Sequence, residues 1–328
     1  MAKKRYFQTL RRWTNFDYLL RKFKWRLREA AQKTLGIAEL EQALSNLPYE
    51  MYDLIQRGEK LLIPRMATID QTLEELLRSE RSIARFGDGE FKYMFFGSSI
   101  GYQQYDEKLA TRLQEVLASK DDEDDRVMIA MIDIFGCRPG MRSLAVQVRP
   151  HLNTCINDEQ QYYNAMIARS VSNMAFVDRL KRLWNDRDVV IVEGSMTRMG
   201  IGNDLLANTR SIRRILAPAE NAWSAYPQIL EEAMRFDHSR LFLIALGPTA
   251  TVLAYDLGMA GYRALDLGHL DICYELLLRG AQEMMPIAGK YVNEVSYRAP
   301  VACKDEKYLQ QVVCSIDTKG TVTPGQKK

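Results

Sequence analysis

Between residues 188 and 282 the chain alternates short apolar runs with helical patterns. The apolar runs predict strands at 188–192, 212–216, 241–246 and 263–266, and the intervening segments predict helices at 224–236, 248–257 and 271–282. Strands that are apolar throughout are buried on both faces, which requires a mainly parallel sheet with helices on both sides. The sequence therefore predicts an α/β fold of the Rossmann-like type.

The segment before residue 188 follows the same pattern less regularly. We predict strands at 82–86 and 127–134, and helices at 68–77, 90–96 and 109–117, with one long helical region over 158–184. The tail after residue 315 is rich in Lys, Gly and Thr, so we expect disorder there. The expected organisation is a basic amphipathic helical extension at 1–64, a catalytic domain at 65–300 and a partly disordered C-terminal segment at 301–328.

Composition narrows the class of protein. With 47% hydrophobic and 27% charged residues, the 328-residue chain has the balance of a globular protein. No apolar run approaches the ~18 residues that span a bilayer, and the N-terminus lacks the apolar core of a signal peptide, so we expect a cytoplasmic protein. The 5 cysteines form no Cys-x-x-Cys pair and there are only 3 histidines, so metal binding must depend on carboxylates.

Residues 1–35 form a basic head. They hold eleven Lys or Arg and two acids, a local charge of +9, so the rest of the chain carries 3 − 9 = −6. Apolar residues recur at helical spacing from Phe16 onward. This pattern is typical of a helix that packs on the domain or on a second copy of the chain, and also of a helix that lies in a membrane surface. Nucleic-acid binding is disfavoured because no recognition motif accompanies the charge.

Two carboxylates follow the first buried strand. Asp88 and Glu90 lie one residue apart between Gly87 and Gly89, and in an extended segment such spacing directs both side chains the same way. Hard oxygen ligands suit Mn²⁺ or Mg²⁺ shared with substrate phosphates. The alternative is a glycine-rich turn whose acids face water.

A second candidate stands where the strand at 241–246 becomes a helix. Pro248 suits the first helical position, and the free N–H groups of that turn, with the Thr249 and Thr251 hydroxyls, would suit a phosphate. A plain strand-to-helix turn explains the same residues. Arg198, beside a short glycine pair, could hold a phosphate or a structural acid.

His269 and Asp271 follow the last predicted strand, with Glu275 one helical turn further on. A histidine beside carboxylates is a candidate base or metal ligand, although a structural histidine fits as well. The chain has no Gly-x-Ser-x-Gly elbow, P-loop or HExxH motif, which disfavours the familiar hydrolases and nucleotide kinases.

Five segments together resemble a known family. They are RFGDGEF at 85–91, EGS at 193–195 with RMGIGNDL at 198–205, RILAPAENA at 214–222, ALGPTATVLAYDL at 245–257 and DLGHLDI at 266–272. In this order they resemble the GT-D-fold glycosyltransferases, first recognised as a domain of unknown function in bacterial adhesin glycosylation. The likeness covers roughly residues 65–300. Cys273 departs from it, since the family often has Glu at that position.

The resemblance implies a site and a reaction. It implies that Asp88 and Glu90 hold a divalent metal, usually Mn²⁺, against the diphosphate of a UDP-sugar. By the same resemblance the donor would be contacted by Arg85, Ser195, Arg198, Asn203, Asp204, Asn221, Gly247, Thr249 and Thr251. The implied reaction moves the sugar to a glycan or glycoprotein acceptor, and a base must remove the acceptor proton, for which His269, Asp271 and Glu275 are the candidates.

The sequence is also compatible with two other functions. The chain could be a non-catalytic scaffold of a glycan-assembly complex that docks through its basic helix, although the intact acid pair disfavours this. It could also be a metal-dependent sugar-phosphate hydrolase that uses the same acids. Release of UDP only in the presence of an acceptor would separate a transferase from a hydrolase.

Overall fold

The computed structural model describes residues 64–119, 125–134, 142–157, 159–292, 294–295 and 303–325. The chain divides into two compact units, Met1–Leu61 and Leu62–Lys328. All the described residues belong to the second unit. The basic head at 1–35 and its expected helix lie outside the described residues, so that expectation stays a prediction.

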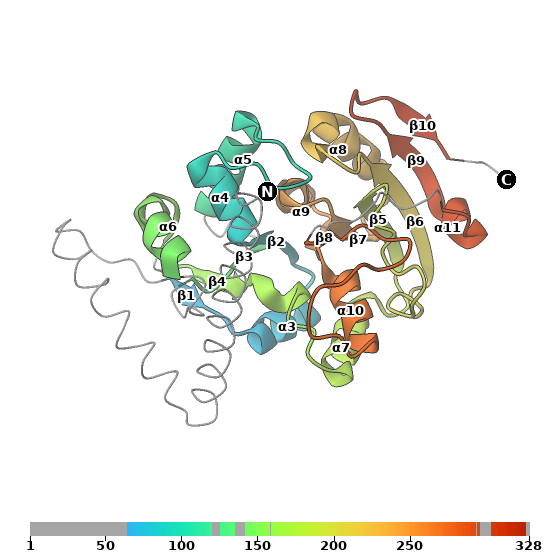
Figure 1. The fold of residues 1–328 in the computed structure, drawn as a ribbon, viewed down its shortest axis with the longest axis horizontal. Helices are drawn as coiled ribbons and strands as arrows, with labels where there is room; N and C mark the ends of the chain where they lie inside the picture. Colours follow the sequence, from blue (N-terminus) through green and yellow to red (C-terminus); the bar gives the residue numbers. More distant parts are fainter. Residues whose placement is uncertain are drawn as a thin grey trace, which may run out of the picture. The chain divides into compact units, whose positions relative to one another are not determined.

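The second unit is built on one sheet, shown in Figure 1. Across the described residues its strand order is β1-β4-β3-β2-β8-β7-β5-β6-β9-β10. Neighbouring strands are parallel throughout, except for the antiparallel pair β9 and β10 at one edge. The strands are β1 Arg65–Met66, β2 Ser82–Phe86, β3 Val127–Met131, β4 Gln161–Asn164, β5 Asp188–Gly194, β6 Ser211–Ala217, β7 Leu241–Ala245, β8 Arg263–Asp266, β9 Val312–Ile316 and β10 Val322–Pro324.

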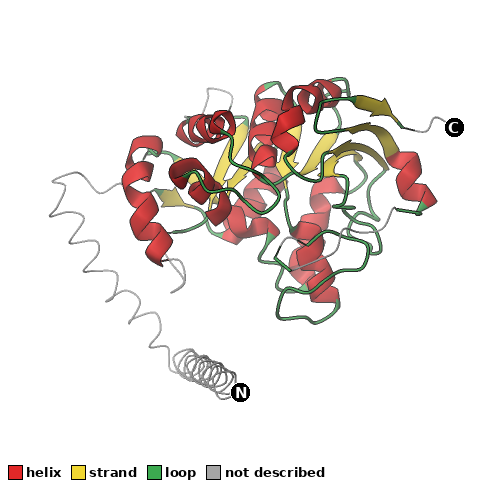
Figure 2. Ribbon diagram, turned by 45° about the horizontal axis from the view of Figure 1, so that its top comes forward, coloured by secondary structure: helices red, strands yellow, loops and turns green. Residues whose placement is uncertain are grey.

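Helices cover both faces of this sheet (Figures 1 and 2). One face carries α4 Asp88–Phe96, α5 Glu107–Ala118, α8 Tyr226–Met234 and α9 Pro248–Met259, and the other carries α3 Ile69–Arg78, α7 Met174–Lys181 and α10 Leu270–Leu278. At the ends of the sheet, α6 Arg142–Cys155 packs on α4 and α5, and α11 Glu306–Gln311 packs on β6 and β9. Short 3-10 turns are η2 Ala165–Ala168, η3 Arg182–Trp184 and η4 Ala222–Ala225. The predicted fold class is confirmed.

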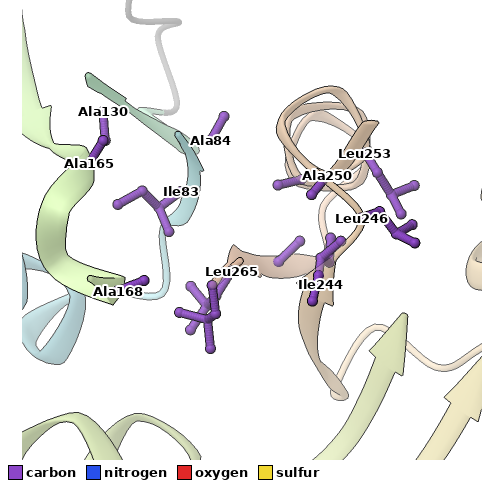
Figure 3. Close-up of a cluster of buried hydrophobic side chains, with 14 of the residues drawn as sticks. Ile83, Ala84, Ala130, Ala165, Ala168, Ile244, Leu246, Ala250, Leu253 and Leu265 are labelled. Carbon is purple, nitrogen blue, oxygen red and sulfur yellow. The ribbon is translucent and has the colours of Figure 1, made fainter. Parts of the chain in front are cut away.

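The continuous apolar runs form the core, part of which Figure 3 shows. Ile83, Leu265 and Ile244 are fully buried on the adjacent strands β2, β8 and β7. Leu265 pairs with Ile83 and with Leu243, so Ile244 points to the opposite face of the sheet. Each such side chain contributes about 1.5–3 kcal/mol by leaving water. Because both faces of the central strands are covered, their polar residues are displaced to the strand ends, where the chain turns.

The region 158–184 differs from the single long helix that its composition predicts. It contains β4, η2, α7 and η3 in succession. Two asparagines interrupt it: the Asn164 side chain accepts a hydrogen bond from Met166 N at 3.0 Å, and the Asn173 side chain accepts one from Phe176 N at 2.9 Å. Each caps a new element, since a short polar side chain competes with helical backbone bonding.

The C-terminal tail also differs from the expected disorder. β9 pairs with β6 and β10 pairs with β9, so residues up to 324 extend the sheet. Cys314 and Ile316 are buried at alternate positions, a period-2 signal that the polar composition hides. The described residues after 300 therefore belong to the same compact unit as the rest of the sheet.

Within the described ranges, no helix combines the length and the apolar character that crossing a membrane needs.

Candidate active site

A cleft opens at the carboxyl ends of β5, β6, β7 and β8. It holds about 660 Å³ of space including its open mouth. Ligands of parallel sheets bind at this edge, near the strand at which the order reverses, and β5 pairs with β6 on one side and β7 on the other. The lining residues are Tyr102, Gln103, Gly194, Thr197, Pro218, Ala219, Asn221, Ala222, Ala245, Leu246, Gly247, Gly268, His269, Ile272 and Tyr291.

Two tyrosine rings form an aromatic wall of the cleft. Tyr102 and Tyr291 meet edge to face with their ring centroids 6.5 Å apart. Tyr102 also packs on the turn before α9, where Gly247 has φ +57° and ψ −140°. A Cβ on Gly247 would lie 2.2 Å from the Tyr102 ring. Only glycine therefore fits at this turn, both for its backbone conformation and for the contact.

Asn221 positions the segment that carries Tyr102. Its φ of +54° is left-handed, a conformation that asparagine tolerates better than most residues. The Asn221 N–H donates to the Tyr102 carbonyl at 2.8 Å, and its side-chain oxygen accepts from Gln104 N at 2.7 Å. Asn221 thus lines the cleft and fixes the aromatic wall.

The two predicted phosphate-binding hydroxyls do not line the cleft. The Thr251 hydroxyl donates to the Arg85 carbonyl at 2.8 Å and joins α9 to β2. The Thr249 hydroxyl is buried, and no partner for it lies within the described part of the chain. At this turn the structure brings only Gly247 to the cleft surface.

Asp88 and Glu90 begin α4 and do not lie in an extended segment. The helix starts at Asp88 with Gly87 as its N-cap, so the two side chains point in different directions, as residues i and i+2 of a helix must. Asp88 is exposed and pairs with Lys92 at 2.8 Å. Glu90 turns back, and its Oε2 accepts a hydrogen bond from Gly87 N at 2.8 Å. The expectation of two parallel side chains is therefore wrong, because helix formation sets in two residues early.

The Glu90 carboxyl group lies in an environment short of positive charge. Burial raises its pKa and the nearby Asp266 raises it further, while Arg85 offsets this only in part. Arg85 is committed elsewhere, to Asp266 Oδ1 at 3.0 Å and the Ala165 carbonyl at 2.8 Å. Burial also raises the pKa of Tyr102, and the charge of Glu90 adds to that effect. The Glu90 carboxyl therefore lies within electrostatic reach of the aromatic wall.

Of the two acids, Glu90 is the one whose surroundings suit a divalent cation. Within the described residues no three or more His, Cys, Asp or Glu side chains cluster closely enough to hold a metal by themselves. Mg²⁺-like ions, however, are commonly held by one or two carboxylates together with substrate phosphates. A desolvated carboxyl with a raised pKa is the kind of group that such a cation would stabilise. The exposed Asp88–Lys92 ion pair stabilises the protein by only about 0–1 kcal/mol, so Asp88 could exchange Lys92 for a cation at little cost.

His269 lines the cleft within a charged cluster. Its Nε2 lies 3.0 Å from the Glu294 carboxylate, and its Nδ1 lies 3.2 Å from an N–H of Arg169, which also donates to Glu294 at 3.0 Å. Burial tends to raise the pKa of Glu294, but His269 and Arg169 outweigh it and hold the pKa at about 2. With Arg169 donating to Nδ1, the imidazole proton is on Nε2 and is directed at Glu294.

Asp271 and Glu275 lie in a buried network instead of in the cleft wall. Lys290 Nζ contacts Asp271 at 2.6 Å and Glu275 at 3.1 Å, and all three side chains are at most 5% exposed. Asn203 donates to Asp271 at 2.9 Å and to Glu275 at 2.7 Å. Carboxylates that are already paired and screened from the cleft are poorly placed to accept a substrate proton. Their evident role is to hold the loops after β5 and α10 together.

The other residues expected after β5 support the same loops. Arg198 is buried and donates to the Gly289 carbonyl at 2.7 Å. Asp204 pairs with Lys181 at 2.8 Å and accepts from Tyr274. Ser195 is exposed, and its neighbour Thr197 contributes to the cleft wall.

Sequence reasoning missed several cleft residues, namely Tyr102, Gln103, Thr197 and Tyr291, and the cluster partners Arg169, Lys290 and Glu294. Most lie on irregular segments between elements, where hydrophobic periodicity gives no signal. One signal was present: the GYQQYD run at 101–106 places two tyrosines in a polar loop before a helix. Polar loops that carry aromatics are frequent in binding sites.

The fold and the cleft define a Rossmann-like α/β enzyme scaffold with its site at the strand ends. The chain belongs to the glycosyltransferase GT-D fold family, whose model matches residues 83–295. That span includes the cleft strands and the acid pair. The resemblance noted in the sequence is thereby confirmed.

Relatives and solved structures agree with this assignment. The chain is 36% identical over 267 residues to the "Probable glycosyl transferase Gly" of Streptococcus gordonii and 33% identical over 266 residues to "Glycosyltransferase GlyD" of Streptococcus pneumoniae serotype 4. Each match covers 76% of this chain but only 38% and 32% of the relative, so the chain spans about a third of their length.

Two solved structures match this chain over almost their whole length. One, described as "The highly conserved domain of unknown function 1792 has a distinct glycosyltransferase fold", has a TM-score of 0.70 at 33% identity and covers 78% of this chain and 97% of that one. The other, "A New Glycosyltransferase (DUF1792) from Streptococcus sanguinis", has a TM-score of 0.68 at 34% identity and covers 76% and 98%.

Proposed function

We propose that this chain is a metal-dependent glycosyltransferase that moves a hexose from a UDP-sugar to a glycan or glycoprotein acceptor. The observation that carries the proposal is the cleft at the ends of β5 to β8, with the Glu90 carboxyl within electrostatic reach of its aromatic wall. The family assignment supports sugar transfer. The donor, the metal and the acceptor are the parts that the proposal adds.

The nucleotide would occupy the cleft between the aromatic wall and the strand ends. Tyr102 and Tyr291 offer ring surfaces to a base or ribose, and Asn221 holds the Tyr102 segment in place. Gly194 and Gly247 line the cleft, and the side chains that they lack leave room for Thr197 and Tyr102 in its wall. Asn221 and Gly247 are two of the donor contacts that the resemblance implies. Of the others, Arg85 lies on β2, Thr249 and Thr251 lie in α9, and Ser195, Arg198, Asn203 and Asp204 lie on the loop after β5.

Asp88 and Glu90 would hold Mn²⁺ or Mg²⁺ beside the diphosphate. When bound, the cation neutralises the charge that develops on the leaving UDP as the bond between sugar and phosphate breaks. Glu90 would give up part of its cap on Gly87, and Asp88 its surface pair with Lys92. The loss of these two contacts would cost little free energy compared with what a desolvated carboxylate gains by pairing with the cation.

His269 is the base that the geometry favours among the three candidates. Its Nδ1 is covered by Arg169, whose side chain is 40% exposed. A donor phosphate that draws Arg169 away would uncover Nδ1, and the acceptor hydroxyl could then pass its proton to this nitrogen as its oxygen bonds to the sugar. Glu294 would stabilise the imidazolium that forms. Asp271 and Glu275 then act only by holding the loops.

The test is a nucleotide-sugar panel scored by thermal shift with and without Mn²⁺, followed by turnover with a glycan acceptor mixture. A UDP-sugar at 100 times its Kd should stabilise the chain by about 2.7 kcal/mol. Asp88→Asn and Glu90→Gln should abolish the Mn²⁺-dependent part of this shift and lower transfer by orders of magnitude. Lys92→Gln removes a charge from the same helix but frees Asp88 from its surface partner, so it should keep or strengthen the Mn²⁺-dependent shift.

Three outcomes would contradict the proposal. Transfer activity that does not change when a chelator is added would contradict the proposed metal dependence. UDP release at the same rate without acceptor would indicate a hydrolase. Absence of binding to every nucleotide sugar would favour a non-catalytic scaffold.

A further inference from the structure

A second groove lies beside the cleft, along α5. It is shallow and open, holds about 680 Å³ of space including its mouth, and no role has been assigned to it above. We call it the α5 groove. Its lining residues are Glu107, Lys108, Thr111, Arg112 and Glu115 of α5, and Trp223 of η4.

The α5 groove adjoins the cleft through one short segment. Ala222 lines the cleft and the next residue, Trp223, lines the groove. Gln103, another cleft residue, accepts a hydrogen bond from Trp223 N at 3.4 Å. The cleft and the groove therefore have η4 as a common wall.

The groove combines one flat ring with a row of hydrogen-bonding side chains. Trp223 stacks on Tyr226 with ring centroids 4.5 Å apart, which fixes the indole as a rigid wall. Glu107, Thr111 and Glu115 recur at four-residue spacing and so lie along one side of α5. In the described part of the chain no side chain pairs with the Glu107 carboxylate or the Lys108 ammonium. Donors and acceptors are thus available beside an aromatic surface.

The charges in the groove cancel. Glu107 and Glu115 carry two negative charges, Lys108 and Arg112 two positive ones, and Arg112 is held by Glu115 at 2.9 Å and by Asp256. A polyanion such as nucleic acid requires a net positive surface, and an apolar peptide requires an apolar one. A neutral ligand with many hydroxyl groups matches the hydrogen-bond donors and acceptors of α5, and its apolar ring face matches the indole of Trp223.

We propose that the α5 groove binds a neutral oligosaccharide, namely the acceptor glycan of this enzyme. This inference rests on the proposed function for its link to transfer. A pyranose ring would lie against the indole of Trp223, which covers its apolar C–H face. Its hydroxyls would bond to Glu107, Lys108 and Thr111. The end of the glycan would then reach the cleft past Gln103.

The experiment uses the full chain on an array of neutral oligosaccharides, with calorimetry on the best binder. Thr111→Trp fills the groove at an exposed position, so folding does not depend on it. Trp223→Ala removes the ring, and Trp223→Phe keeps a flat surface. Phe96→Ala is the matched control, because Phe96 is an exposed ring on α4 that lines neither the groove nor the cleft.

We expect Thr111→Trp and Trp223→Ala to weaken oligosaccharide binding at least tenfold, with Trp223→Phe and Phe96→Ala close to the unmodified chain. The affinity for UDP should be the same in all variants, and the acceptor KM should rise while the donor KM does not. A chain that binds UDP but no oligosaccharide on the array would overturn the inference, as would unchanged binding in Thr111→Trp. Failure to bind UDP would instead refute the proposed function and leave the groove result standing.

Discussion

Gly247→Ala should damage both the stability and the nucleotide affinity of this protein, for two separable reasons. Gly247 has φ +57° and ψ −140°, a conformation that side chains with a Cβ rarely adopt. The added methyl would also lie 2.2 Å from the Tyr102 ring. The first effect is local backbone strain, and the second displaces the aromatic wall of the cleft.

The two effects have different magnitudes. Backbone strain of this kind costs about 1–3 kcal/mol, and forcing an extra carbon against a packed ring costs about 1–3 kcal/mol more. We therefore expect the free energy of unfolding to fall by about 2–6 kcal/mol, a large share of the ~5–15 kcal/mol of a typical domain. Because Tyr102 must leave its place, the Kd for UDP should rise at least tenfold, or about 1.4 kcal/mol.

Urea unfolding and calorimetry with UDP measure these quantities. Gly202→Ala is the matched control, since Gly202 has φ +80° but no atom within 4 Å of an added Cβ, so it should show strain alone. In a Tyr102→Ala background, the cost of Gly247→Ala should shrink to the strain term. An equal cost in both backgrounds, or an unchanged affinity for UDP, would refute the reasoning.

Three further changes test other parts of the site. Glu90→Gln should leave the unfolding free energy unchanged or raise it at neutral pH, because burial raises the pKa of this carboxyl and its ionisation opposes folding. A clear loss of stability would indicate that Glu90 acts only as a helix cap. Lys290→Met should cost about 3–5 kcal/mol in urea unfolding, since it takes the cationic partner from the buried Asp271 carboxylate and leaves Glu275 paired with Arg279 alone; a neutral result would contradict the network. The stability that Glu294 contributes is present above its ordinary pKa of 4.5 and is lost as pH falls toward 2, so Glu294→Gln should flatten the pH dependence of unfolding in that window.

The sheet was predictable because its signal is local. Runs such as 127–131 and 241–245 are apolar at every position, and a strand buried on both faces requires that wherever it falls in the sheet. The strand order was not predictable, because β2 lies beside β8 through contacts such as Ile83 with Leu265, far apart in the chain. Where local signals conflicted, as at 158–184, capping asparagines decided the outcome against helical periodicity.

The site was predictable only in part, since a cleft is formed by several loops that come from distant parts of the sequence. Gly247, Asn221 and His269 stand directly after strands, and the rule that ligands bind at strand ends finds them. Tyr291 and Glu294 reach the cleft from a loop that is fixed by Lys290. Nothing in their local sequence distinguishes that loop from any other surface segment.

The acid pair shows why residue types alone cannot separate structure from chemistry. A glutamate at the third helical position after a glycine cap satisfies the free N–H of Gly87, and a metal site at a strand exit would use the same residue. What distinguishes the two roles is the surroundings of the Glu90 carboxyl. A cap at the surface keeps its water, whereas this carboxyl is desolvated beside Asp266, which β8 brings next to β2. A helix cap gains nothing from a second carboxylate nearby, whereas the cation that we propose would. The observation that bears on the proposed metal site is therefore a contact between strands, which no local motif contains.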